Sequence, residues 1–456
     1  MPADQAELEE GWEAARLIPT AGIRGQEEQE KRATSALLAV LPAVPDFGHA
    51  LLKSLGAPKG NIATYTEVRL KGSDGKTHIP DGAIVVTRGK TRWSCLVEVK
   101  TGRSVLEGSQ VARYIDMARL HNFDAVLTIS NEIRSDSEAL PYEVDRRKVG
   151  KLTVRHVSWW RVLTEAIVQH RFRGIEDPDQ AWILGELVRY LDDPKSGASG
   201  FEGMGEEWAR VRDAARNETL RASDPEAAVI AARWEQFVEY LALQLSQELG
   251  VTVQQARPRG KSPRDRLAAA SRQLADEGTL QGSLRVPGAV GDLQVEANLR
   301  SGRVTTGVEI NAPADKVRPK AKITWLLRQL KEAPDDLRID VSFASRKGTN
   351  SELLRSCRDN PDCLLLAEDP KREPRKFFLA LSRPMGKKRG RTEGSFVTET
   401  RRQTMDFYGE LVQELTPPQP KAPKMTPTEK EPAEPEKPRP EKSEGQARRE
   451  QTAGLG

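Results

Sequence analysis

Two short apolar segments joined by a Gly-Lys pair constrain the fold of this chain more than any other feature. IPDGAIVV (79–86) and RWSCLVEVK (92–100) are rich in β-branched residues, which is typical of β-strands. Between them, Gly89 occupies the first central position of a two-residue type II′ turn, with Lys90 as the second. The sequence therefore predicts a β-hairpin whose turn decides which residues face each other.

The register of this hairpin follows by counting from its turn. With the glycine-lysine pair as the loop, Arg88 pairs with Thr91. Counting back, Asp81 falls directly opposite Glu98, and Lys100 lies two residues farther along the same face. Two carboxylates and an ammonium group are thus predicted to converge.

The chemistry of this face suits a small hard cation. Directly opposed residues have Cβ atoms roughly 5 Å apart, so both carboxylates can reach one ion. Oxygen ligands of this kind favour Mg²⁺ or Mn²⁺ over zinc. The other face of the second strand carries Cys95, Val97 and Val99 and is expected to pack on the core. The alternative is a solvated strand face with an ordinary Glu-Lys pair, because E-x-K tripeptides are common.

The segments around the hairpin predict an α/β domain. Residues 26–41 carry apolar positions at helical spacing after an acidic first turn, which indicates a helix. The same patterns predict strands at 64–70, 125–130 and 152–160 and a helix at 106–121. The elements follow the order αβββαβ, with one further strand.

Four short motifs lie on these elements in order: Glu30 at the start of the first helix, Pro80-Asp81, Glu98-Val99-Lys100, and Gln110 with Tyr114 on the second helix. Together they resemble the PD-(D/E)XK nuclease superfamily, whose restriction-endonuclease-like core has the αβββαβ order. The spacing of the last motif resembles the Q-x-x-x-Y pattern of the RecB-like branch. The resemblance covers residues 26–160, about a third of the chain.

The resemblance implies a role for each position. Asp81 and Glu98 would hold a Mg²⁺ or Mn²⁺ ion, and Glu30 would be an outer or second-metal ligand. Lys100 would orient the attacking water or stabilise the charge that grows on the phosphate. The chain would then be a metal-dependent nuclease acting on nucleic acid, with DNA as the favoured substrate.

Three further residues have supporting roles in this hypothesis. Gln110 and Tyr114 stand one helical turn apart and would position the site or touch the nucleic-acid backbone. The alternative is one polar and one aromatic residue on an amphipathic helix. Glu67 alternates with Tyr65 and Arg69 on the first strand, as a neighbour of the site or as part of a solvated stripe.

The rest of the chain predicts a second domain. We expect a nuclease-like domain at 1–172, a helical linker at 173–225, an α/β accessory domain at 226–414 and a disordered tail at 415–456. The Gly- and Ser-rich stretch at 196–205 is typical of a flexible joint. The tail holds nine of the 29 prolines among Lys and Glu, so it cannot bury enough apolar area to fold. It could contact a protein partner.

The predicted second domain contains a weaker version of the motif found in the first. Asp292 and Glu309-Ile310-Asn311 resemble the same signature, with Asn in place of Lys. A hairpin loop at Ser301-Gly302 would pair Asp292 with Asn311 and not with Glu309, so this copy would be degenerate.

Its basic clusters, at 256–266, 317–322, 370–376 and 386–391, indicate a surface for nucleic-acid backbone or a solvated charged surface. The rival hypothesis for the whole chain is a catalytically silent nucleic-acid-binding or protein-interaction module on the same fold.

Composition sets the remaining limits. The net charge of +4, from 71 basic and 67 acidic residues, neither demands nor excludes a polyanionic partner. Three cysteines are too few for a disulfide framework, and Cys357 and Cys363 have no histidine after His170 with which to build a zinc site. Without a long apolar run, a secretion signal or an ATPase motif, we expect a cytoplasmic protein that does not contact membranes.

Overall fold

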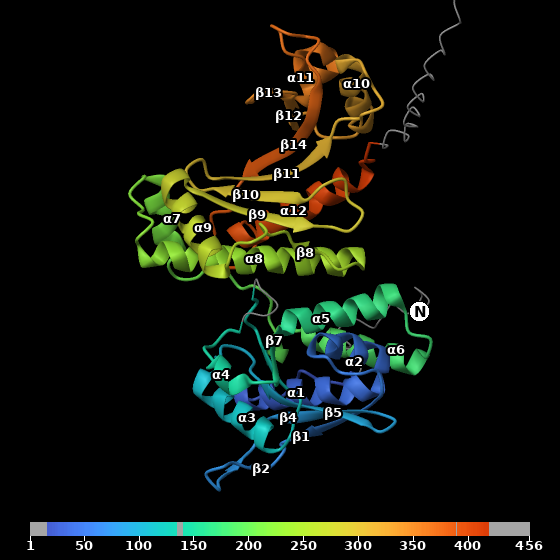
Figure 1. The fold of residues 1–456 in the computed structure, drawn as a ribbon, viewed down its shortest axis with the longest axis vertical. Helices are drawn as coiled ribbons and strands as arrows, with labels where there is room; N and C mark the ends of the chain where they lie inside the picture. Colours follow the sequence, from blue (N-terminus) through green and yellow to red (C-terminus); the bar gives the residue numbers. More distant parts are fainter. Residues whose placement is uncertain (1–15, 135–139, 389, 419–456) are drawn as a thin grey trace, which may run out of the picture. The chain divides into compact units, whose positions relative to one another are not determined.

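The computed structural model describes residues 16–134, 140–388 and 390–418, which fall in one compact unit. Their strands form one sheet of five strands, one of seven and a small pair, interleaved with helices (Figure 1). The protein is thus mixed α/β, as predicted. No single described helix is long and apolar enough to span a membrane, and the segments Gly25–Ala43 and Pro45–Leu55, bent by 111°, meet that test only as a pair.

The first sheet and its helices come from the N-terminal part of the chain. In order, the elements are α1 Gly25–Ala43, α2 Pro45–Leu52, η1 Lys53–Leu55, β1 Asn61–Thr66, β2 Leu70–Lys71, β3 Thr77–His78, β4 Gly82–Arg88, β5 Thr91–Val99, α3 Gly108–Leu120, β6 Ala125–Ser130, α4 Arg146–Val149, β7 Thr153–Ser158, α5 Trp159–Val168 and η2 Gln169–Arg173. The sheet order is β1-β4-β5-β6-β7. β1, β4 and β5 are antiparallel, whereas β6 and β7 run parallel to β5, so the carboxyl ends of β5, β6 and β7 share one edge.

Helices cover both faces of this sheet. The alternation along β5 decides which residues face which helix, because successive side chains point to opposite faces. Cys95, Val97 and Val99 are fully buried in the cluster that includes α1, whereas Leu96 packs with Ile115 of α3. Glu98 follows Leu96 on the α3 face, inside the protein.

The predicted register of the β4–β5 hairpin is confirmed. Arg88 pairs with Thr91 and Gly82 pairs with Val97, so Asp81, directly before β4, comes opposite Glu98. Gly89 has a φ of 57°, which a type II′ turn requires at its first central position and which glycine adopts without strain.

Two predicted strands are shorter than expected. The strand predicted at 64–70 ends at Thr66, because Glu67 has a left-handed φ of 51° that breaks the extended backbone. The strand predicted at 152–160 ends at Ser158, whose Oγ accepts the backbone N–H of Arg161 and so caps α5. The Trp pair at 159–160 therefore begins a helix.

The segment between the sheets is helical and well packed. It contains α6 Pro178–Asp192, η3 Pro194–Ser196, α7 Trp208–Arg216 and α8 Pro225–Leu249. The stretch at 196–205, predicted as a flexible joint, buries Phe201 and Met204 in the core. Phe201 lies 5.1 Å, between ring centroids, from Phe237 of α8, so this stretch contributes to packing.

The second sheet is antiparallel throughout. Its elements are β8 Gln254–Gln255, α9 Pro263–Glu277, β9 Thr279–Arg285, β10 Leu293–Asn298, β11 Arg303–Asn311, α10 Pro319–Gln329, β12 Arg338–Phe343, β13 Thr349–Leu353, α11 Leu354–Asp359, η4 Pro361–Leu364, β14 Pro374–Pro384, α12 Phe396–Glu410 and η5 Val412–Glu414. The strand order is β13-β12-β14-β11-β10-β9-β8. β14 thus lies between β11 and β12, whereas in the first sheet β6 pairs directly with β5. The two sheets differ in topology at this point.

The predicted register of the second hairpin is wrong. Leu293 pairs with Val308, which brings Asp292 opposite Glu309 and not Asn311. The loop spans residues 299–302, so it contains the predicted Ser-Gly pair but begins two residues earlier, at the buried Leu299. The two carboxylates do not form a joint site, since Asp292 is paired with Arg285 at 2.7 Å and Glu309 with Lys376 at 2.6 Å.

The predicted basic clusters contain ordered elements that the sequence analysis missed. The cluster at 256–266 includes the start of α9, where Ser262 caps the helix and Pro263 follows, a signal that local reasoning could have found. The cluster at 370–376 leads into β14. Lys322, in the cluster at 317–322, is buried and paired with Glu373 at 2.5 Å. Part of the positive charge of these clusters is therefore neutralised by an ion pair within the protein.

The segment predicted as a disordered tail lies outside the described residues from 419 onward. Its first residues pack on the folded unit. Leu415 is buried, and the backbone N–H of Thr416 donates to Oε1 of Gln329 at the end of α10.

Candidate functional site

The predicted site residues meet at the carboxyl end of β5. The Oδ2 atom of Asp81 accepts the backbone N–H of Val99 at 2.7 Å, which ties the residue before β4 to the end of β5. The backbone of Lys100 is held on both sides. Its N–H donates to the carbonyl of Ile129 at 2.8 Å, and its own carbonyl accepts the indole N–H of Trp159 at 2.9 Å.

Glu98 is the most buried member of the site, with 1% of its surface exposed. Its Oε1 atom accepts a hydrogen bond from Nε2 of Gln110 at 2.7 Å and lies 2.9 Å from Nζ of Lys100. Its Oε2 atom is buried and has no hydrogen-bond partner. The alternative of a solvated strand face is therefore wrong for this residue.

Lys100 joins the two carboxylates that approach it from different elements. Its Nζ atom lies 3.0 Å from Oε1 of Glu30 on α1 as well as 2.9 Å from Glu98, and it donates to the carbonyl of Val99 at 3.1 Å. Glu30 is thus brought to the site across a separation of 70 residues in the chain. The ammonium group is close to two carboxylates and mostly shielded from water.

The supporting residues on α3 also reach the site. Gln110 donates one hydrogen bond to Glu98 and another to the hydroxyl of Tyr114 at 3.3 Å, and Tyr114 is buried. This pair therefore orients the carboxylate instead of only lining an amphipathic helix. Glu67, by contrast, has an exposed side chain that pairs with Lys31 at 3.5 Å, although its backbone N–H donates to the carbonyl of Asp81.

Burial dominates the electrostatics of these groups. Burial, and next the charge of Asp81, raises the pKa of Glu98 to about 7 against the lowering effect of Lys100. Burial likewise raises the pKa of Asp81 and the pKa of Glu30. Burial opposes the charged form of Lys100, but Glu98 and Glu30 together raise the pKa of its ammonium group. The site therefore contains one stably protonated ammonium group, Lys100, among carboxyl groups whose ionisation is unfavourable.

No group of three or more His, Cys, Asp and Glu side chains in the described parts of the chain is arranged to hold a metal ion. At the predicted site, the ammonium group of Lys100 lies 3.0 Å from Glu30 and 2.9 Å from Glu98. The three cysteines are free thiols, and the Sγ atoms of Cys357 and Cys363 are 3.5 Å apart.

The structure adds polar neighbours that the sequence analysis missed. Thr128 of β6 and His156 of β7 are in register with Glu98, so the three side chains share one face of the sheet. The hydroxyl of Thr128 lies 3.2 Å from Nδ1 of His156 and 2.9 Å from the hydroxyl of Tyr142. The sequence shows both as polar residues within predicted strands, but only the register of the sheet aligns them with Glu98.

No family model, no curated protein and no solved structure matches this chain.

Replacing Glu98 with Gln is expected to stabilise the metal-free protein near pH 8 by roughly 2–3 kcal/mol. The pKa of Glu98 is raised to about 7 in the fold, so its proton stabilises the folded state at low pH and this contribution is lost as the pH rises through about 7. Gln keeps the neutral form at every pH. The gain should therefore fade as the pH falls through 4.5, the ordinary pKa of a glutamate, because the parent carboxyl then becomes protonated in both states.

Chemical denaturation of both proteins across this pH range measures the effect. Glu107→Gln, at an exposed position before α3, is the matched control and should change little. A Glu98→Gln protein that is less stable than the parent at high pH would show that ionised Glu98 supports the fold.

Proposed function

We propose that this protein is a metal-dependent nuclease that hydrolyses phosphodiester bonds in nucleic acid. One observation carries the proposal: Glu98 is buried opposite Asp81 and beside Lys100, with one carboxylate oxygen that no protein group satisfies. A buried carboxylate without full hydrogen bonding is costly to a fold, so such groups call for an explanation. A site for a cation supplies one.

The carboxylates of Asp81 and Glu98 have the oxygen chemistry that a hard divalent cation prefers, which supports the proposal. Oε2 of Glu98 has no hydrogen-bond partner, and Asp81 uses its Oδ2 atom for the backbone N–H of Val99. Carboxylate oxygens are the ligands that Mg²⁺ and Mn²⁺ prefer. A nearby cation would also favour the ionised form of Glu98, whose pKa burial raises to about 7. When bound, the ion would supply a hydroxide nucleophile near neutral pH and countercharge for the phosphate.

The chain's own residues would perform the remaining tasks. Asp81 and Glu98 would hold the ion, with Glu30 as an outer ligand. Lys100, held 2.9 Å from Glu98, would orient the attacking water or offset charge on the phosphate as it grows. Gln110, supported by Tyr114, would hold the Glu98 carboxylate in position.

The alternative is a catalytically silent nucleic-acid-binding or protein-interaction module on the same fold. The ion pairs of Lys100 with Glu30 and Glu98 favour this reading, because they compensate these charges with no further ligand. Cleavage assays separate the two functions.

The purified protein is expected to cut nucleic acid in Mg²⁺ or Mn²⁺ and to be inactive in excess chelator. Incubation with linear, closed circular and single-stranded DNA, and with RNA, tests the activity and identifies its substrate. Glu98→Gln, prepared in parallel, controls for a contaminating nuclease. Cleavage that persists in chelator would contradict a mechanism that depends on two carboxylates and a metal ion.

A further inference from the structure

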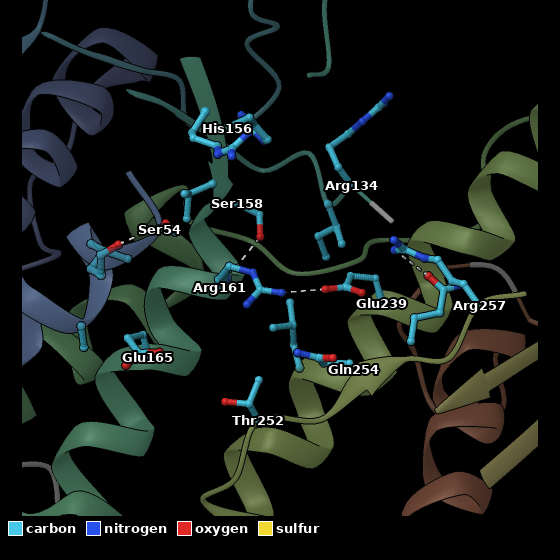
Figure 2. A pocket seen from close by; sticks show the side chains of 17 residues that line it. Ser54, Arg134, His156, Ser158, Arg161, Glu165, Glu239, Thr252, Gln254 and Arg257 are labelled. Atoms are coloured by element: carbon cyan, nitrogen blue, oxygen red, sulfur yellow. Dashed lines mark hydrogen bonds and ion pairs between the residues drawn. The ribbon is translucent and has the colours of Figure 1, made fainter. Parts of the chain in front are cut away.

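A cavity of about 430 Å³ lies where β7 passes into α5, apart from the carboxylates described above (Figure 2). Ser158 and Arg161 line it from this junction, and residues of α8 and of the segment around β8 complete the wall. Its size is that of a small-molecule site. Ligands of α/β proteins commonly bind beyond the carboxyl ends of parallel strands, and β7 belongs to the same parallel set as β5.

Positive charge prevails in the lining, which contains four arginines and two glutamates: Arg134, Arg155, Arg161, Arg257, Glu165 and Glu239. His156 is neutral near pH 7, because burial lowers its pKa to about 4. Within and beside this lining, Glu165 pairs with Arg173 of η2, Arg134 lies 3.8 Å from Glu132, and Arg161 pairs with Glu239. The surplus of cations suits an anionic ligand.

The guanidinium group of Arg257 has one nitrogen without a hydrogen-bond partner. Its Nε atom is buried without a hydrogen-bond partner, while Nη2 donates to Gln255 at 3.3 Å. Buried donors are normally paired, and a guanidinium group binds phosphate through two parallel hydrogen bonds. In Figure 2, Arg161 points toward Glu239, and Arg257 lies on the far side of Glu239 in that view.

The remaining polar groups suit a sugar and a base. The Glu239 carboxylate lies 2.7 Å from Nη2 of Arg161, and Thr252 and Gln254 lie on the same wall. Carboxylates accept hydrogen bonds from ribose hydroxyls, and amide side chains pair with base edges. We propose that this cavity binds a nucleotide unit, with its phosphate on Arg257 and Arg161 and its sugar and base against Glu239 and Gln254.

The nucleotide unit can come from two sources, a free nucleotide or a nucleic-acid strand. Adjacent strands are about 4.8 Å apart, so β7 lies about 10 Å from β5 along the shared edge. A strand that rises about 3.4 Å per nucleotide would cover this separation in about three nucleotides. Binding of a nucleic-acid strand rests on the proposed nuclease function, whereas binding of a free nucleotide does not.

Binding is measured on the full chain in chelator, so that cleavage plays no part. The probes are a fluorescent single-stranded oligonucleotide, followed by anisotropy, and adenosine and guanosine mono- and triphosphates, followed by calorimetry. Arg257→Gln removes the charge while keeping an amide near Gln255, and it is expected to weaken binding about tenfold or more. Arg216→Gln, at an exposed position on α7, is the matched control and should bind like the parent.

Each result identifies a source or overturns the proposal. Selective weakening of the oligonucleotide assigns the cavity to a strand, and selective weakening of a nucleotide assigns it to a free ligand. The double variant Arg161→Gln/Glu239→Gln removes the ion pair as a unit and should also weaken binding, which guards against misfolding of one variant. Unchanged affinity in both folded variants, or no binding of any probe by the parent, would overturn the nucleotide site even if the protein cuts DNA.

Discussion

Replacing Lys100 with Met is expected to reduce cleavage by about a hundredfold or more at saturating Mg²⁺. Its ammonium group lies 2.9 Å from Glu98 and 3.0 Å from Glu30, which places a positive charge beside the proposed metal ligands. Met keeps the length of the stem but loses the charge. The loss should therefore appear in the rate of the chemical step and not in the affinity for nucleic acid.

The same variant has a second signature in metal titration. Lys100 helps to keep Glu98 ionised, so its removal should raise the pKa of Glu98 above about 7. Mn²⁺ affinity should then be close to that of the parent well above pH 7 and weaker at neutral pH. A merely structural role for Lys100 would not make metal affinity depend on pH in this way.

Lys90→Met is the matched control, because Lys90 is exposed in the turn of the same hairpin. It loses the same group and should cut like the parent. If Lys100→Met also cuts like the parent under saturating Mg²⁺, the assigned role is wrong. The silent binding module, or a contaminating nuclease, then becomes the better explanation.

Replacing Asp81 with Asn should lower metal affinity and cleavage together, with cleavage falling about a hundredfold or more. Asn removes the negative charge but can still accept the backbone N–H of Val99 that Asp81 accepts at 2.7 Å. The fold should survive for this reason. Burial also raises the pKa of Asp81, so the neutral side chain removes a cost of ionisation at neutral pH.

Asp124 provides an unusually close control for this change. Its Oδ2 atom accepts the backbone N–H of Ser94, at 2.8 Å, near the opposite end of β5. Asp124→Asn thus alters the same kind of contact on the same strand, away from the site. Calorimetric Mn²⁺ titration and a cleavage assay should separate the two variants. Equal metal affinity in Asp81→Asn and the parent would remove Asp81 from the set of metal ligands.

Taken together, the two substitutions distinguish a catalyst from a binder. Both should lose cleavage, but only Asp81→Asn should lose metal affinity at high pH. A binding module would retain nucleic-acid affinity in both variants and show no cleavage in the parent. The comparison therefore tests whether Asp81 binds the metal ion while Lys100 acts in the chemical step.

Local sequence determined the arrangement of the β4–β5 hairpin. A two-residue turn with glycine at its first position leaves one register, and this register brings Asp81 opposite Glu98. The same reasoning was wrong for the second hairpin, where burial of Leu299 moved the turn and brought Asp292 opposite Glu309. Strand register can be counted from a turn when the turn residues themselves select the turn. The count is unreliable when packing of a neighbouring residue decides where the chain turns.

Only the tertiary structure decided how the site is surrounded. The sequence proposed Glu30, Gln110 and Tyr114 as site residues, but their contacts with Lys100 and Glu98 depend on how α1 and α3 pack on opposite faces of the sheet. No sequence motif could predict that Glu98 is buried or that its Oε2 atom lacks a hydrogen-bond partner. The cavity at the end of β7 likewise gathers residues from α5, α8 and the segment around β8. Such features depend on contacts between residues distant in the chain, whereas turns and strand alternation are local, and this difference explains why the sequence predicted the hairpin but not its environment.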